Sequence, residues 1–383
     1  MKVEQRHWSE SEGWSEMRGD GLGEKAQLVF VFAGTSIIER EDLLSDLYRA
    51  YPNAHIFGCS TAGEICSTEV SDDTLVATAI EFKSTRFQIV TEEIPNSDQS
   101  RSVGRRLARA FDPKGLVHIF LLSDGLNING SELVKGLLKN LPKEVTATGG
   151  LSGDGTRFGR TFVIKEGKAK RNLVAAIGFY GGDLHIGYAS LGGWDTFGPE
   201  RLVTKSEGNI LYQLDGKSAL VLYKEYLGEH AGGLPSTALL FPLNVKVPGN
   251  ERAVVRTILA IDEEKQSMTF AGDIPEGSYA QLMRANFDRL IDGAAGAATA
   301  SYEAGGSRTP DLAILISCVG RKLVLNQRVE EEIECVRDVL GQHTVLTGFY
   351  SYGEISPFSP NAKCELHNQT MTITTMWEDE KAA

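Results

Sequence analysis

The sequence has few cysteines, no long apolar run and no excess of positive charge. Its cysteines are Cys59, Cys66, Cys318, Cys335 and Cys364. They are odd in number and none forms a CxxC pair, so we expect no disulfide framework and a reducing, cytoplasmic setting. No stretch approaches the roughly 18 uninterrupted apolar residues of a membrane span, and the opening MKVEQRHWSESEGWSE is too polar for a signal peptide. A net charge of −12 argues against nucleic acid and membrane lipid as partners.

Several catalytic motifs are also missing. Leu211 stands where the phosphate-binding loop before Gly-Lys-Ser needs a glycine, and Phe158 stands where a dinucleotide fingerprint needs its third glycine. Asp154 replaces the last glycine of a nucleophile elbow around Ser152. We therefore expect no enzymatic activity. A hydrolase that uses Cys59 or Ser152 as its nucleophile is kept as an alternative.

One pattern occurs three times along the chain. A short apolar strand is followed by a small-residue loop, a helix, a second strand and a glycine-rich loop. The three copies span 28–65, 116–155 and 311–355. Their expected helices span 39–51, 130–141 and 328–340, with apolar residues at three- and four-residue spacing. This alternation predicts an α/β fold with parallel strand pairing inside each unit.

The region between the second and third copies has a different texture. Residues 160–181 and 253–277 have the pattern of antiparallel hairpins, and 218–228 is an expected helix that ends at a glycine. The fold class expected is therefore α/β, with repeated strand–loop–helix–strand units in mixed sheets in two halves and antiparallel hairpins in the middle. The expected domains are a polar extension over 1–24, an N-terminal domain over 25–217 and a C-terminal domain over 218–383.

Two of the glycine-rich loops end in the same three residues. They are GCSTAGEI (58–65) and FYSYGEIS (349–356). Ligands of open α/β sheets bind outside the carboxyl ends of the strands, where such loops lie. The candidate ligand-binding residues are Ser60, Thr61, Glu64, Ser351, Tyr352 and Glu354. Each glutamate has a second interpretation, in which it caps backbone amides of its own turn. The sequence leaves open whether the two loops share one pocket.

Two histidines are candidates for binding a haem iron, which a histidine in an apolar pocket can ligate. His230 lies among apolar and small residues in YLGEHAGGLPSTALLFPL, and His367 begins a strand in CELHNQTMTI. His118 and His185 lie within apolar strand patterns, where a hydrogen-bonded core histidine is the default interpretation.

The motifs GCSTAGEI, SDGLNINGSELVKGL, GGLSGDG, FYSYGEISP and LHNQTMT resemble the FIST family (F-box and intracellular signal transduction) over nearly the whole chain. The resemblance implies a bacterial sensory protein that binds a small ligand. One branch of the family, similar in size to this chain, consists of haem-binding nitric oxide sensors that regulate a partner histidine kinase. It implies haem as the favoured cofactor, with His230 as the candidate axial ligand and His367 as the alternative, and a histidine kinase as the partner.

Other outcomes stay open beside this one. The same scaffold is compatible with sensing an amino acid or a similar metabolite through the residues of the two Gly-Glu-Ile loops. A homodimer is also left open. No motif of the family assigns the axial residue in this sequence.

Overall fold

Three α/β units, each built around a parallel strand pair, form the body of the protein. The computed structural model describes residues 1–15, 21–249, 253–359 and 362–379. The parallel pairs are β3 (Leu28–Ala33) with β4 (His55–Ser60), β9 (Leu116–Ser123) with β10 (Thr146–Leu151), and β23 (Leu312–Cys318) with β24 (Val345–Ser351). The antiparallel neighbours of β3, β9 and β23 are β7 (Leu75–Glu81), β13 (Leu173–Tyr180) and β27 (Met371–Glu378). The repeated units expected from the sequence are confirmed.

Helices join the two parallel strands within each unit. They are α1 (Thr35–Ile38) and α2 (Glu41–Ala50) in the first unit, α4 (Gly130–Leu138) in the second, and α7 (Val319–Leu325) and α8 (Glu331–Leu340) in the third. The three expected helices are confirmed, each slightly shorter than expected. The start of α4 is fixed by Asn129, whose side chain accepts a hydrogen bond of 3.1 Å from the Glu132 amide.

Two further helices and several edge strands complete the three sheets. The added helices are α3 (Ser100–Ala110) and α6 (Phe287–Ala304). The added strands are β1 (Lys2–Ser9), β2 (Gly13–Trp14), β8 (Arg86–Glu93) and β14 (Leu184–Leu191). Short 3₁₀ turns occur at 23–25, 97–99 and 326–328.

Each unit also gives a strand to the sheet of another unit. The first unit sends β5 (Glu64–Cys66) and β6 (Glu69–Ser71) to β24 of the third. The third sends β25 (Gly353–Pro357) and β26 (Cys364–His367) to β10 of the second. The second sends β11 (Val163–Lys165) and β12 (Lys168–Lys170) to β4 of the first. The exchange is cyclic, so the body has an approximate threefold arrangement.

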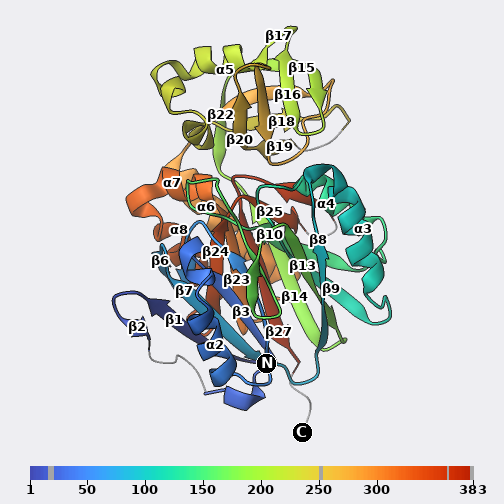
Figure 1. Ribbon diagram of the computed structural model, residues 1–383, viewed down its shortest axis with the longest axis vertical. Coiled ribbons are helices and arrows are strands. Elements are labelled where there is room, and N and C mark those ends of the chain that lie inside the picture. Colours follow the sequence, from blue (N-terminus) through green and yellow to red (C-terminus); the bar gives the residue numbers. More distant parts are fainter. Residues whose placement is uncertain (16–20, 250–252, 360–361, 380–383) are drawn as a thin grey trace.

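A separate antiparallel sheet lies on top of the body as a cap, residues 194–285 (Figure 1). Its strands are β15 (Trp194–Glu207), β16 (Ile210–Leu214), β17 (Lys217–Ser218), β18 (Leu243–Lys246), β19 (Val254–Arg256), β20 (Ile258–Asp262), β21 (Ser267–Phe270) and β22 (Tyr279–Ala285). It also carries α5 (Ala219–Leu227) and 3₁₀ turns at 228–233 and 236–240. The domain boundary expected at 217/218 coincides with β17, inside this cap.

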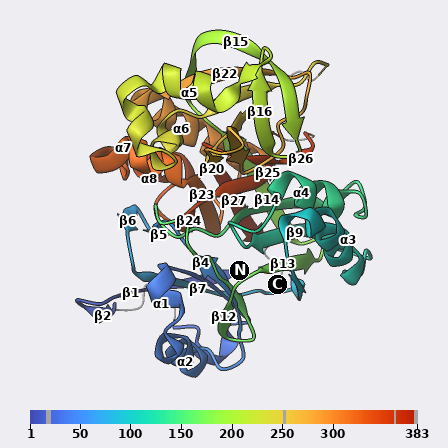
Figure 2. The same ribbon diagram turned by 45° about the horizontal axis from the view of Figure 1, so that its top comes forward.

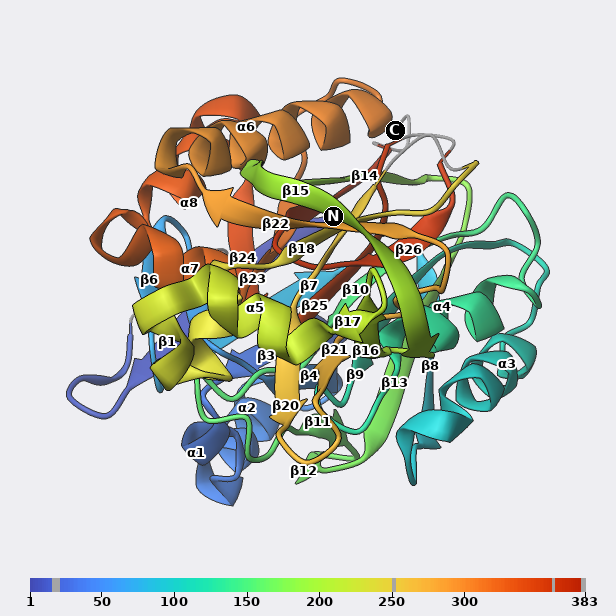
Figure 3. The same ribbon diagram turned by 90° about the horizontal axis from the view of Figure 1, so that it is seen from above.

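The three units share one buried aromatic cluster between their sheets. Phe30 of β3 lies 5.4 Å from Phe120 of β9, and Phe32 of β3 lies 4.7 Å from Phe349 of β24, between ring centroids. All four side chains are fully buried. Each contributes about 1.5–3 kcal/mol through burial. Seen from above, the helix groups α1/α2, α3/α4 and α6/α8 occupy separate positions around the periphery (Figure 3). The aromatic cluster at the centre holds the three units together and so fixes their strand-exit loops relative to one another.

Candidate functional site

The loops that follow β4, β10 and β24 occupy equivalent positions. In each parallel strand pair, one glycine of the second strand lies very close to the first strand. A Cβ added to this glycine would meet a carbonyl oxygen of the first strand at 1.8–1.9 Å. These glycines are Gly58, Gly149 and Gly348, and the oxygens belong to Val31, Leu121 and Leu315. No side chain fits at such a distance, so the close strand approach requires glycine. The loop that begins three residues after each of these glycines therefore starts at the same position along the strand pair in every unit.

A ring of three backbone hydrogen bonds links the loops. The amide donors are Ala62, Gly153 and Tyr352, and their acceptors are the carbonyls of Tyr350, Ser60 and Leu151, at 2.8, 3.0 and 3.2 Å. Each loop donates to a different neighbour, in the same cyclic order as the exchanged strands. The two Gly-Glu-Ile loops, which are far apart in the sequence, are thus in direct contact.

The glutamates of these two loops are buried, and both accept hydrogen bonds from the same kinds of donor. Glu64 accepts hydrogen bonds from the Thr61 hydroxyl and from the amide and hydroxyl of Thr74, at 2.9 and 2.7 Å for Thr74. Glu354 accepts them from the Ser351 hydroxyl at 2.6 Å and from the amide and hydroxyl of Thr370 at 3.2 and 3.0 Å. Burial raises the pKa of Glu64 to about 7 and that of Glu354 to about 8, and in both it outweighs these hydrogen bonds.

The other expected ligand residues also bond to the protein itself. The Ser60 hydroxyl donates to the Gly153 carbonyl at 2.8 Å and accepts from the Phe162 amide at 2.9 Å. The Tyr352 hydroxyl donates to the Gly155 carbonyl at 3.1 Å, and its ring stacks on Phe158 at 4.6 Å between centroids. These side chains join the loops to each other and to the 153–162 segment.

A cavity of about 540 Å³ opens beside the first two loops. Of the six expected ligand residues, Thr61 and Glu64 line it, whereas Ser60, Ser351, Tyr352 and Glu354 do not. Its other lining residues are Gly34, Ala62, Gly63, Val70, Asp72, Asp73, Gly155, Thr156, Arg157, Val319, Lys322, Leu323, Asn326 and Val329. The first Gly-Glu-Ile loop thus faces this cavity, and the corresponding residues of the second lie away from it.

Charges of both signs lie on the wall of this cavity. Lys322 of α7 donates to the Ala62 carbonyl at 3.1 Å and pairs with Asp72. Arg157 pairs with Asp154 at 2.7 Å and leaves 55% of its side chain exposed. Although burial opposes it, hydrogen bonds from Arg157 and Thr35 hold the pKa of Asp154 below its ordinary value. The wall therefore presents both positive and negative groups to the cavity.

Sequence reasoning did not single out Lys322, Arg157 or Asp72. A signal for two of them was present, because Lys322 follows β23 by four residues and Arg157 follows β10 by six. Both therefore lie at carboxyl ends of parallel strands, where ligands of α/β sheets bind. Asp72 follows β6, an exchanged strand whose place in another unit's sheet could not be read from the sequence.

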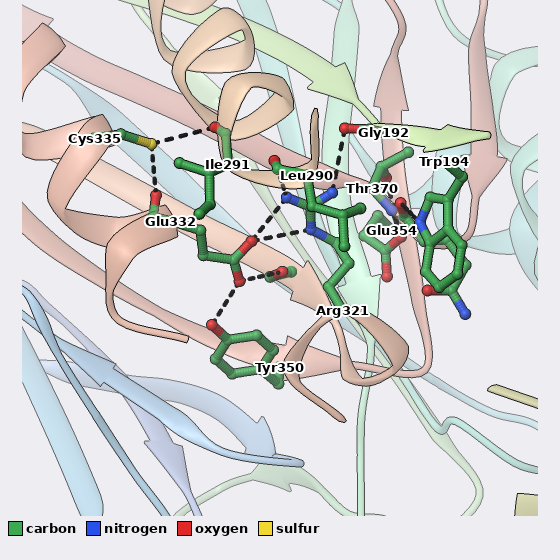
Figure 4. Close-up of polar contacts among 12 residues, drawn as sticks. Gly192, Trp194, Leu290, Ile291, Arg321, Glu332, Cys335, Tyr350, Glu354 and Thr370 are labelled. Carbon is green, nitrogen blue, oxygen red and sulfur yellow. Dashed lines mark hydrogen bonds and ion pairs between the residues drawn. The ribbon is translucent and has the colours of Figure 1, made fainter. Parts of the chain in front are cut away.

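A buried ion pair joins Arg321 of α7 to Glu332 of α8 (Figure 4). Arg321 donates to Glu332 through Nε at 3.0 Å and through Nη2 at 2.8 Å, and also to the carbonyls of Leu290 and Gly192. The Tyr350 hydroxyl donates to the other oxygen of Glu332 at 2.6 Å. The Tyr350 ring in turn faces the Lys322 ammonium at 5.6 Å. The cavity wall is thus connected to the segment that leads into the cap.

The two candidate nucleophiles lack an activating environment. Cys59 is fully buried, and burial raises the pKa of its thiol. His55 is exposed at the opposite end of β4. The Ser152 hydroxyl is buried and donates to the Ser123 and Phe162 carbonyls at 2.7 and 3.1 Å. An activated nucleophile needs a neighbouring base or a lowered pKa, and neither residue has one in these contacts.

Neither candidate histidine is placed to hold haem. His230 is exposed on a 3₁₀ turn, with its ring 5.5 Å from that of Phe241. His367 is buried, its Nε2 is bonded to the Ser356 carbonyl at 2.8 Å, and burial lowers the pKa of its imidazole to about 4. Neither lines the cavity described above. Neither histidine is therefore suited to serve as an axial haem ligand.

Within the described residues, no group of three or more histidine, cysteine, aspartate or glutamate side chains is arranged to hold a metal ion. Over the same residues, no helix has the length and apolar character needed to span a bilayer.

Three strand-exchanging α/β units thus lie beneath an antiparallel cap, with a cavity at their loops. Models of two family domains match this chain, the FIST N domain over residues 27–217 and the FIST C domain over residues 219–357. The chain therefore belongs to the FIST family, a family of sensory and signal-transduction domains.

Comparison with individual proteins adds little about function. The chain is 24% identical over 307 residues to an uncharacterized protein of Methanocaldococcus jannaschii, a match that covers 70% of this chain. It spans about half (56%) of the length of that relative. Among solved structures it is similar to a chorismatase, with 10% identity, a TM-score of 0.34 and coverage of 97% of this chain and 98% of the other. It is also similar to a cyanuric acid hydrolase from A. caulinodans, with 8% identity, a TM-score of 0.34 and coverage of 92% of this chain and 90% of the other. At such TM-scores neither likeness bears on the function of this chain.

Proposed function

We propose that this protein is a sensor that binds a small zwitterionic metabolite of the amino-acid class in the 540 Å³ cavity. The observation that carries this proposal is the pairing of cations with carboxylates on one wall. Arg157 and Lys322 are suited to a ligand carboxylate, and Asp72 and Asp73 to an ammonium group. The volume lies within the roughly 300–1,000 Å³ of small-molecule sites.

The sensory role rests on membership of a signal-transduction family. A separate protein would read the bound state, and a histidine kinase is the class of partner that the family resemblance suggests. The contacts from Lys322 through Tyr350 and Glu332 to Arg321 support a route for the signal, since Arg321 also bonds to Gly192 beside the cap. A ligand that displaces Lys322 from Asp72 alters the first contact of that series.

Thermal shift measurements with the standard amino acids test the binding step. A ligand at 100 times its dissociation constant adds about 2.7 kcal/mol to the free energy of unfolding. Arg157→Gln removes one charge-assisted hydrogen bond, so we expect the affinity to fall roughly ten- to hundredfold. Arg109→Gln, at an exposed position on α3, is the matched control and should bind as the wild type does. The proposal fails if no amino acid binds, or if Arg157→Gln binds as tightly as the control.

A further inference from the structure

A second cavity, of about 350 Å³, lies where the cap meets the body. The body supplies α4 and β26, which lie side by side beneath the cap (Figure 2). The cap supplies β18, β19 and the segment after β21. Nothing in this cavity belongs to the loops that line the first one, because the two sets of lining residues have no member in common.

The wall of this cap–body cavity is mainly apolar. Val134 and Leu138 of α4 and Leu366 of β26 line it from the body, and Val245 and Val254 line it from the cap. An apolar wall binds the hydrocarbon part of a ligand by removing it from water. The volume is at the lower end of the roughly 300–1,000 Å³ of small-molecule sites.

One buried cation lines the same cavity. Arg256 of β19 is 6% exposed. Its Nε donates to the Asp273 carbonyl at 3.1 Å, and its Nη1 donates to the Leu366 carbonyl at 3.0 Å and the Val255 carbonyl at 3.3 Å. Within the described part of the chain, Nη2 has no hydrogen-bond partner. Nη2 is not one of the buried unpaired atoms of the described residues, so it reaches the surface of the cavity, where it can donate to a ligand.

Asp273 is the carboxylate with the largest electrostatic effect on Arg256, and its own hydrogen-bond partners lie in the body. Asp273 accepts from Lys135 at 2.5 Å and from the Asn129 side chain at 2.7 Å, so its oxygens are directed to the body. Burial lowers the pKa of Arg256 to about 10, which still leaves its guanidinium charged at neutral pH. The charged residues of the lining are three cations (Lys135, Arg256, Lys363) and two carboxylates (Asp273, Glu365), an excess of one positive charge. This excess, with the Arg256 guanidinium beside the apolar wall, favours an anionic ligand.

We propose that the cap–body cavity is a second ligand site, and that it binds a small monocarboxylate with an apolar body. The carboxylate accepts from Arg256 Nη2, and the apolar part packs against Val134, Leu138 and Val254. Because the walls come from both the cap and the body, such a ligand stabilises their contact. This proposal does not depend on the amino-acid site, which uses other residues.

Isothermal titration with octanoate tests the proposal, with octan-1-ol as the uncharged probe of the same chain length. We expect octanoate to bind saturably with one site per chain and octan-1-ol to bind at least about tenfold more weakly, because the charge-assisted hydrogen bond is absent. Arg256→Gln should weaken octanoate by about tenfold or more for the same reason. Lys246→Gln, at an exposed position on β18 outside the cavity lining, is the control for charge in general and should keep most of the affinity.

A second variant decides the outcome if Arg256→Gln fails to fold. Val254→Phe fills the cavity from a half-buried position and keeps the arginine, so it should abolish octanoate binding while the far-UV circular dichroism stays that of the wild type. The proposal is overturned if octanoate does not bind the wild type, if octan-1-ol binds equally well, or if Val254→Phe binds octanoate unchanged. Unchanged amino-acid binding in Val254→Phe would show that the two sites are separate.

Discussion

Glu332→Gln is expected to cost far more stability than Glu331→Gln, although the two glutamates are neighbours on α8. Glu332 and its partner Arg321 are both 0% exposed, and Glu332 accepts four hydrogen bonds, from Arg321 Nε and Nη2, Ser317 and Tyr350. Glu331 is 43% exposed and pairs with Arg328, which is 42% exposed. The two substitutions are chemically identical and differ in burial.

The magnitude follows from what each substitution leaves behind. Glutamine at 332 keeps the volume but removes the negative charge, so the Arg321 guanidinium stays buried without a counter-charge. Breaking a buried pair in this way costs about 3–5 kcal/mol. Glutamine at 331 removes an exposed pair, which is worth about 0–1 kcal/mol. We therefore expect the two variants to differ by about 2–5 kcal/mol.

Urea unfolding at pH 7, followed by tryptophan fluorescence and circular dichroism, measures this difference. The double variant Arg321→Met, Glu332→Leu should recover part of the loss, because it leaves no buried charge. The recovery is incomplete because the buried Ser317 and Tyr350 hydroxyls lose their acceptor. If Glu332→Gln lost less than about 1 kcal/mol, as expected for Glu331→Gln, the buried pair would not carry the stability assigned to it.

Two further outcomes concern the strand-exit loops. Native Glu64 and Glu354 have pKa values of about 7 and about 8, whereas the ordinary pKa of glutamate is 4.5, so the native state binds more protons across that window. The free energy of unfolding should therefore fall as pH rises through it, by up to about 1.4 kcal/mol per pH unit and carboxyl, and a Glu64→Gln, Glu354→Gln variant should flatten this slope in urea titrations. Gly153→Ala places a Cβ 2.7 Å from the Ala62 amide nitrogen and should cost about 1–3 kcal/mol; Gly182→Ala, with open space around it, should cost less than about 0.5 kcal/mol.

The repeated units could be predicted because each is local in sequence. The apolar spacing that defines α2, α4 and α8, and the short apolar runs of β3, β9 and β23, lie within stretches of about a dozen residues. The exchange of β5, β11 and β25 could not be predicted in the same way. Each of these strands pairs with a unit distant in the chain, and no local pattern specifies which of three equivalent edges it joins.

The candidate site was predictable only in part for the same reason. Residues of the GCSTAGEI loop were found from the loop itself, and Thr61 and Glu64 line the cavity. Arg157 and Lys322 reach that cavity from the second and third units, so their place depends on how the units pack. The FYSYGEIS loop is equivalent in sequence, but its Ser351, Tyr352 and Glu354 are buried by other parts of the fold.

The three loops share a backbone but place their carboxylates differently, and this difference locates the cavity. In the first and third loops the glutamate turns back to its own loop and to Thr74 or Thr370. In the second loop Gly155 stands at the glutamate's position and Asp154 precedes it, held by Thr35 and Arg157. Asp154 thereby fixes an arginine that remains more than half exposed on the cavity wall. The positions that keep the threefold pattern hold the units together, and the position that breaks it places an exposed arginine on the cavity wall.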